Sequence, residues 1–298
     1  MQNQNFINFK KVRSLGDMLS DTLKFLSTEW QPFFMTIVKL AIVPVLIAIA
    51  AAIYFLMQSN SFYGGLLDLN SLDGSEIEDI NFNFSSILVP LAIFSFSYLI
   101  AYALVTVASL SYIKSYIKNK GIINYEEIQN DAKTTFWSYV GLFFVVGIIV
   151  FIGTLFCFLP GIYFVVVLSL SIPIMIFQNS GVLDSINGAF TLIKDNWWET
   201  FGILIVVQIL ILIISFIVQL PVGMYQGVDT TVMLQGEYPN ELLELFSDPV
   251  YLILLGISYL VKFILYIIST IVTVFIYFDI REQKNPTSND IIDEIGLS

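Results

Sequence analysis

Five long apolar stretches alternate with short polar segments along this chain of 298 residues. The stretches cover residues 32–57, 86–113, 136–178, 200–228 and 249–278. A hydrocarbon layer of about 30 Å takes about 20 helical residues to cross, so most of these stretches predict one membrane-spanning helix each. The third is long enough for two helices, and the pair Pro160 and Gly161 near its middle is a turn signal. The pattern therefore predicts six membrane-spanning helices in three hairpins.

Amphipathic segments precede the outward helix of each predicted hairpin. The clearest covers residues 15–26, with an apolar face at helical spacing made of Leu15, Met18, Leu19, Thr22, Leu23 and Leu26. A second precedes residue 197 and carries Leu183, Ile186, Phe190 and Ile193, and a shorter one has Ile128 and Ala132 behind a capping box at Asn124 and Glu127. We expect each to form a helix that lies in the cytoplasmic interface.

The three segments align with one another at constant offsets, which predicts an internal repeat. Asp17 aligns with Asp184, Trp30 with Trp197 and Phe34 with Phe201; residues 136–137 align with 197–198. Tryptophan prefers the lipid headgroup level, so Trp30, Trp137, Trp197 and Trp198 are expected to mark where each outward helix begins. The predicted fold is an all-α, single polytopic domain over residues 1–298, with repeat units at 13–113, 122–178 and 181–278 and a tail at 279–298.

Basic residues fall on one side of this arrangement. Eleven lie in the segments assigned to the termini and inner loops, and none in residues 58–85, around Pro160 or in residues 229–248. Cytoplasmic loops carry an excess of Lys and Arg, so both termini are expected in the cytoplasm of a bacterium, with the protein in the inner membrane.

Composition narrows the classes of function. Hydrophobic residues make up 57% and charged residues 12%, there is no histidine, there is one cysteine, and the net charge is −11. These figures exclude His-dependent catalytic triads and His-ligated metals, and they argue against a disulfide framework and a nucleic-acid partner. The acidic segment from Asp68 invites a calcium interpretation, but position six of the loop is Asp73 where glycine is needed, so no metal or other cofactor is expected.

Two lysines lie inside the apolar stretches. Lys262 is the more unusual, because it lies about 18 Å and about 24 Å from the two ends of its predicted span by helical rise. A charge at that depth is costly and should face the bundle interior or a wet cavity, which makes Lys262 the candidate functional residue, although a purely structural role stays open. Lys39 lies about eight residues inside the cytoplasmic end of the first span, and its side chain can reach the headgroups by snorkelling.

The second half of the chain resembles a known membrane family. The motifs that carry the resemblance are residues 159–161, Pro173, 181–185, 194–198, Gly202 and 277–281. They are similar to the glycerophosphoryl diester phosphodiesterase membrane-domain family and its YciC-like relatives, which implies a six-span protein. Asp279 and Arg281 match the family ending, for which a helix-end aspartate and a positive-inside arginine are the simpler explanation. The enzymatic name belongs to a separate soluble domain, so no catalytic activity is carried over.

These observations predict a non-enzymatic multi-pass protein whose partners are the lipid bilayer and other membrane subunits. The first hypothesis is a subunit or scaffold of a larger membrane assembly. The alternative is a transporter or lipid-handling protein with an intramembrane cavity around Lys262.

Overall fold

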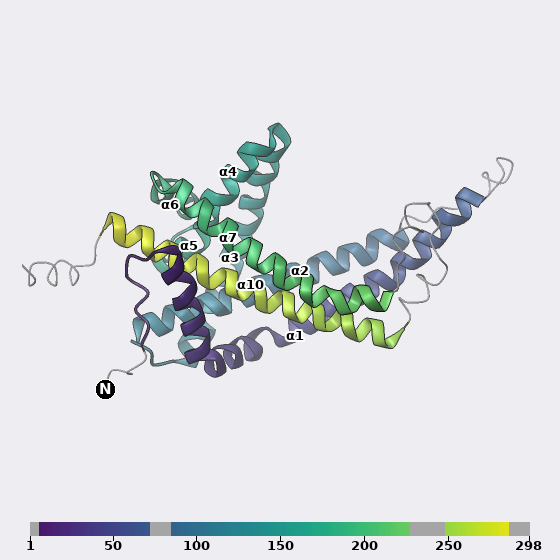
Figure 1. The fold of residues 1–298 in the computed structure, drawn as a ribbon, viewed down its shortest axis with the longest axis horizontal. Helices are drawn as coiled ribbons and strands as arrows, with labels where there is room; N and C mark the ends of the chain where they lie inside the picture. The colour runs from purple at the N-terminus through teal and green to yellow at the C-terminus, as the bar shows by residue number, and fades with distance from the viewer. Residues whose placement is uncertain (1–5, 72–84, 227–247, 286–298) are drawn as a thin grey trace, which may run out of the picture. The chain divides into compact units, whose positions relative to one another are not determined.

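The computed structural model describes residues 6–71, 85–226 and 248–285 of the chain, and within them it contains helices and no strand. In chain order the helices are α1 (Leu15–Ser71), α2 (Ser85–Lys118), α3 (Tyr125–Phe156), α4 (Phe158–Ser169), α5 (Ser171–Gln178), α6 (Val182–Ile193), α7 (Trp197–Gln226) and α10 (Pro249–Lys284) (Figure 1). Six segments are long and apolar enough to cross a membrane, with α4 and α5 together forming one of them. The chain is therefore a multi-pass, all-helical membrane protein.

Helix boundaries differ from the expected ones at two places. The predicted first span ends at residue 57, but α1 continues to Ser71, because residues 58–71 contain no proline to stop it. The expected turn at Pro160 and Gly161 lies earlier, at Cys157, whose extended backbone (φ −170°, ψ 147°) separates α3 from α4. Pro160 is instead in the first turn of α4, where a missing N–H breaks no helical hydrogen bond.

The amphipathic segments are helical, but they do not form three separate helices. Residues 15–26 are the first turns of α1, the segment after Asn124 is the start of α3, and only α6 is a helix of its own. The Asn124 side chain caps α3 by accepting the N–H of Glu127, as the sequence predicts. The Glu127 carboxylate accepts hydrogen bonds from Lys118, Ser115 and Asn119, which fixes the turn between α2 and α3.

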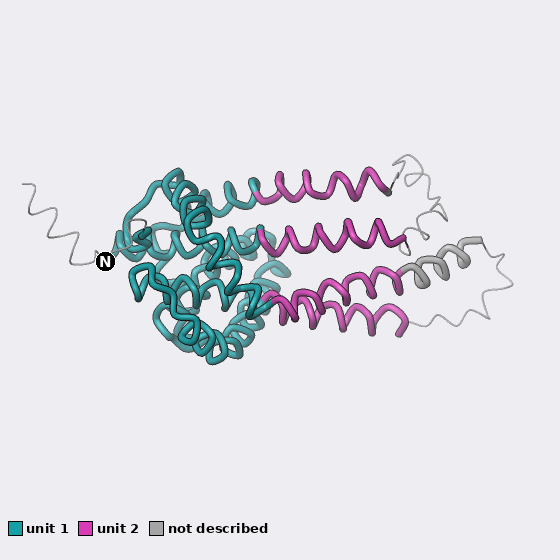
Figure 2. The backbone as a smooth tube through the Cα atoms, turned by 90° about the horizontal axis from the view of Figure 1, so that it is seen from below, with its two compact units in different colours: residues 1–41, 103–210, 265–298 teal, residues 42–102, 211–264 magenta. Residues whose placement is uncertain are grey.

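The chain folds into two compact units (Figure 2). Unit 1 comprises residues 1–41, 103–210 and 265–298, and unit 2 comprises residues 42–102 and 211–264. Each unit is discontinuous in sequence, because the long helices α1, α2, α7 and α10 contribute one part to each.

The core of unit 1 is formed by the second helix of each of the three predicted hairpins: α2, the α4–α5 pair and α10. We call them the return helices. Residues 105–113 of α2 are all buried, as are residues 270–280 of α10 apart from Thr273, and Val166–Leu168 and Ile174–Ile176 of the α4–α5 pair are buried as well. These stretches bury residues all round the helix, as expected for helices enclosed by others.

The outward helices of unit 1 bury the same aligned positions. At the offsets found in the sequence, the buried residues coincide in three sets, one residue from each repeat: Thr22, Ile128 and Ala189; Phe33, Tyr139 and Thr200; Thr36, Leu142 and Ile203. The three segments therefore present the same face to the interior of unit 1.

Unit 2 consists of the remaining parts of four helices. Its buried cluster is Val222, Tyr251 and Leu255, and Phe55 stacks on Phe94 with ring centroids 5.7 Å apart. At the start of α10, the Asp248 carboxylate accepts the Tyr225 hydroxyl (2.6 Å) and the Val250 N–H (2.8 Å). These hydrogen bonds, led by the one from Tyr225, hold the pKa of Asp248 below its usual value.

The acidic segments that were predicted to lie outside, including most of the calcium-like sequence, fall at residues 72–84 and 227–247, and the end of the tail falls at 286–298. The predictions made for these segments lie outside the described residues.

Candidate functional site

The return helix formed by α4 and α5 is interrupted inside the apolar stretch. α4 ends at Ser169 and α5 begins at Ser171, with Leu170 between them. Pro173 follows in the first turn of α5 and has no N–H, so the carbonyl of Ser169 cannot receive its ordinary helical hydrogen bond. Interrupted helices at membrane depth occur where the backbone is enclosed by protein or borders a cavity.

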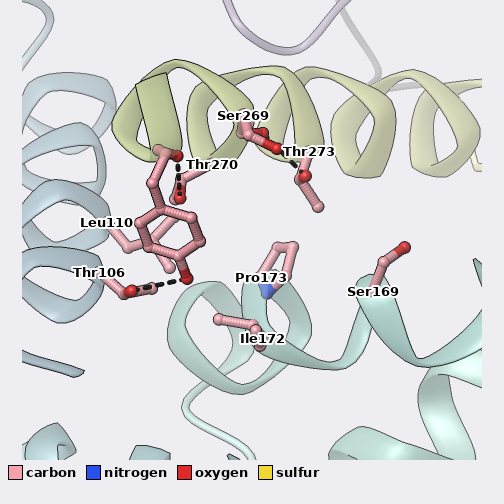
Figure 3. Close-up of a pocket in the computed structure, with 9 residues that line it drawn as sticks. Thr106, Leu110, Ser169, Ile172, Pro173, Ser269, Thr270 and Thr273 are labelled. Atoms are coloured by element: carbon pink, nitrogen blue, oxygen red, sulfur yellow. Dashed lines mark hydrogen bonds between the residues drawn. The ribbon is translucent and has the colours of Figure 1, made fainter. Parts of the chain in front are cut away.

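A cavity of about 130 Å³ lies at this interruption, enclosed by the three return helices (Figure 3). Nine residues line it, and six of them carry hydroxyl groups. They are Thr106 and Leu110 from α2; Ser169, Ile172 and Pro173 from the interrupted pair; and Tyr266, Ser269, Thr270 and Thr273 from α10. We call this space the hydroxyl cavity.

Hydrogen bonds hold the hydroxyl groups in place. The Tyr139 hydroxyl donates to Thr106 Oγ1 (3.3 Å), which is 2.9 Å from the Tyr266 hydroxyl. Thr270 and Thr273 donate to the backbone carbonyls of Tyr266 (3.0 Å) and Ser269 (2.9 Å). The polar groups are therefore ordered by the helices that carry them.

A second cavity of about 390 Å³, which we call the lateral cavity, adjoins the first. The two share Ser169, Ser269 and Thr273. Its other walls come from α3, α4 and α7: Thr154, Phe158, Gly161, Ile162, Val165, Val166, Phe201, Leu204, Ile205 and Gln208. Phe158, Val165 and Ile205 are exposed, so the cavity reaches the apolar surface of unit 1. A mainly apolar space with a few fixed polar groups is the usual form of a small-molecule site.

Lys262, the candidate from the sequence, belongs to unit 2, whereas all residues that line the two cavities belong to unit 1. It is not among the described residues that line either one, and its side chain is exposed, whereas its depth in the apolar stretch predicts an interior or cavity-facing lysine. Its Nζ lies 5.2 Å from the ring centroid of Tyr259, one turn closer to the start of α10. If one membrane boundary lies at Asp279, a hydrocarbon layer of about 30 Å ends about 20 residues earlier, near Tyr259, and the ammonium would be within snorkelling reach of that boundary.

Lys39 and the tryptophans lie at the surface or close to it. The Nζ of Lys39 is 5.3 Å from the ring centroid of Tyr125, the first residue of α3. Trp30, Trp137 and Trp198 are exposed. Trp197 differs: its ring stacks with Phe201 and with Tyr163 of α4, and its Nε1 is buried without a hydrogen-bond partner among the described residues.

Asp279 belongs to a buried polar cluster of unit 1 that also contains Arg13, whereas Arg281 is partly exposed beside it in the sequence. Asp279 is 1% exposed and accepts the backbone N–H of Arg13 (2.6 Å) and the Gln283 side-chain amide (3.0 Å). Arg281 donates to the Tyr277 hydroxyl (3.1 Å). The N-terminal segment therefore covers Asp279, and the explanation as a helix-end aspartate beside a positive-inside arginine stays a prediction.

Arg13 is the residue of this cluster that sequence reasoning missed. Its guanidinium is buried, donates to Asp21 (2.9 Å) and to the carbonyls of Phe9, Lys11 and Asn8, and lies over the ring of Phe275. In the sequence it is only one of several basic residues before the first span. A buried Glu29, which accepts the Tyr112 hydroxyl (2.8 Å), was also missed, although an acid immediately before an apolar stretch was a visible signal.

Comparison with protein-family models, with curated proteins and with solved structures finds no match for this chain.

Proposed function

We propose that this protein binds an amphiphilic, lipid-like molecule within the membrane. The observation that carries the proposal is a pair of neighbouring cavities that share three lining residues, one with hydroxyl groups on six of its nine lining residues and the other mainly apolar and open to the surface of unit 1. A molecule with a small polar head and a hydrocarbon chain fits such a pair, with the head in the hydroxyl cavity and the chain in the lateral cavity. The proposal keeps the lipid-handling alternative predicted from the sequence but moves it from Lys262 to the interrupted return helix.

The test is to fill the lateral cavity. Leu204 lines it, and Leu204→Trp places a large ring there; Leu210→Trp adds the same ring to an exposed position of the same helix, outside the cavity. Both variants are purified in mild detergent, and bound amphiphiles are measured by native mass spectrometry. We expect Leu204→Trp to lose most of the bound amphiphile and Leu210→Trp to retain it. Equal occupancy in a correctly folded Leu204→Trp variant would place the bound molecule elsewhere and contradict the proposal.

Several expectations from the sequence stay predictions beside this one. They are the non-enzymatic character, the role as a subunit or scaffold, the bacterial inner membrane with cytoplasmic termini, and the likeness to the phosphodiesterase membrane-domain family. A pull-down in mild detergent tests the subunit role, since an obligate subunit migrates with stoichiometric partners.

A further inference from the structure

The hydroxyl cavity offers hydrogen-bond acceptors in excess of donors. The hydroxyls of Ser169, Thr270 and Thr273 donate their protons to helix carbonyls, so their oxygens retain only accepting capacity. The bond between Thr106 and Tyr266 uses one further proton. Pro173 adds another acceptor, because it leaves the Ser169 carbonyl without its helical donor.

Charge is missing from the lining of both cavities. None of the described residues that line them is Lys, Arg, Asp or Glu. An anionic head group would meet lone pairs without a cation to pair with, and an ammonium group would be buried without a counter-ion. Burying an unpaired charge costs far more than burying a hydroxyl group that forms hydrogen bonds.

From these two observations we infer that the bound amphiphile is neutral and carries one or more hydroxyl groups on its head. The inference rests on the proposed function and names the chemical class of its ligand: a long-chain alcohol or an acylglycerol. The head group donates hydrogen bonds to the acceptor oxygens of α10 and of the interrupted helix. The chain passes the shared wall of Ser169, Ser269 and Thr273 into the lateral cavity.

Four probes with the same hydrocarbon chain test the head group. They are oleyl alcohol, mono-oleoylglycerol, oleyl phosphate and oleylamine, titrated into the delipidated full-length protein and followed by native mass spectrometry. The two neutral probes are expected to bind at least about tenfold more tightly than the charged ones.

A variant that lacks one hydroxyl group of the cavity, together with a matched control, tests whether the preference for neutral probes arises in the hydroxyl cavity. Thr273→Val keeps the side-chain shape and removes a cavity acceptor, so it should weaken binding of the neutral probes by about fivefold to tenfold. Thr191→Val removes a hydroxyl that makes the same type of bond, to the carbonyl four residues earlier, on the exposed side of α6, and should change nothing.

The outcomes separate the two proposals. Equal binding of all four probes, or tighter binding of a charged one, would overturn the head-group inference and leave the amphiphile site standing. Failure of all four to bind the wild-type protein would overturn both. Equal weakening by Thr273→Val and Thr191→Val would show that the preference does not arise in the hydroxyl cavity.

Discussion

At the scale of single residues, the polar side chains enclosed by this membrane protein are arranged in two different ways. The hydroxyl groups around the cavity bond mainly to their own helices, whereas Arg13 joins segments far apart in the sequence. Its backbone N–H reaches Asp279 and its guanidinium reaches Asp21 and three backbone carbonyls. A buried arginine is tolerated only when nearly all its donors are used, as they are here.

Replacing Arg13 should therefore destabilise unit 1. Arg13→Met removes the nearer of the two cations that pair with Asp21, since Lys24 Nζ stays 3.6 Å away, and it leaves several carbonyls without a donor. Removing one member of a buried ionic pair costs at most about 3–5 kcal/mol. The melting temperature of the purified variant, measured in detergent, is expected to fall well below that of the wild type. Lys10→Met, an exposed neighbour in the same segment, should leave it unchanged. Similar melting temperatures for both variants would mean that the cluster contributes little.

The sequence shows which residues are charged, but it does not predict which residues they contact. The snorkelling of Lys39 stays a prediction, and the structure adds a contact that the sequence did not indicate, to the ring of Tyr125. The bond from Arg13 to Asp279 spans 266 residues, and no local pattern indicates such a partner. The predicted depth of Lys262 in the membrane rests on its distance to the two ends of an apolar stretch. Because α10 is longer than the hydrocarbon layer of a membrane, that distance does not fix the depth.

At the scale of helices, α3 and α4 pack unusually closely. A Cβ added to Gly161 would overlap Thr154 Oγ1 and lie 3.1 Å from Thr154 Cα, and one added to Gly153 would lie 2.6 Å from the ring of Phe164. Small residues at such contacts let two membrane helices approach each other. Gly161 was part of the predicted turn signal, but its role in the structure is to allow this contact.

Gly161→Ala should separate the hairpin. The new methyl group has to displace backbone as well as side chain, and overpacking of this kind costs about 1–3 kcal/mol. Gly147→Ala is the control in α3, because nothing lies within 4 Å of its added Cβ. Thermal unfolding in detergent should show a loss for Gly161→Ala only; an equal response of the two variants would contradict the close contact.

The helices and their order were predictable from the sequence, but the interruption between α4 and α5 was not. The apolar stretches, the cap at Asn124 and the aligned amphipathic segments follow from local periodicity, which explains why the helices and their order were expected. The break at Leu170 lies between two serines within a stretch that is otherwise apolar, so hydrophobic periodicity does not indicate it. Pro173 was the available signal, and it gains meaning only when α2 and α10 are known to enclose it.

At the scale of the whole molecule, the tip of the α3–α4 hairpin is apolar. Leu155, Phe156, Phe158 and Leu159 surround Cys157 and are all exposed. Only five residues beyond the start of α4, Tyr163 stacks on Trp197 at the start of α7, with ring centroids 5.9 Å apart. If Trp197 marks the cytoplasmic headgroup level, the tip lies within about 9 Å of that level along α4 and stays in the hydrocarbon layer. If Trp137 marks that level instead, the tip lies about 30 Å from it along α3.

Cys157 makes this arrangement testable in the wild-type protein, because it is the chain's one cysteine. A membrane-impermeant maleimide should not label it in whole cells, while a permeant maleimide should. As positive and negative controls in a Cys157→Ser background, Gly236→Cys should react from outside and Asn119→Cys only after permeabilisation. Labelling of Cys157 by the impermeant reagent would show that the hairpin crosses to the outer surface, as the basic-residue pattern alone had suggested.

The bond between Arg13 and Asp279 also has a consequence for biosynthesis. The segment before α1 leaves the ribosome first, yet its partner on α10 follows 266 residues later. At about 5–20 residues per second, that interval is roughly 13–53 s. During that interval Phe9 and Arg13 cannot make their contacts with α10, because α10 has not yet been synthesised. Unit 1 can therefore close only after α10 has been synthesised, and chains that stop before residue 279 should be recognised by membrane quality control as incomplete.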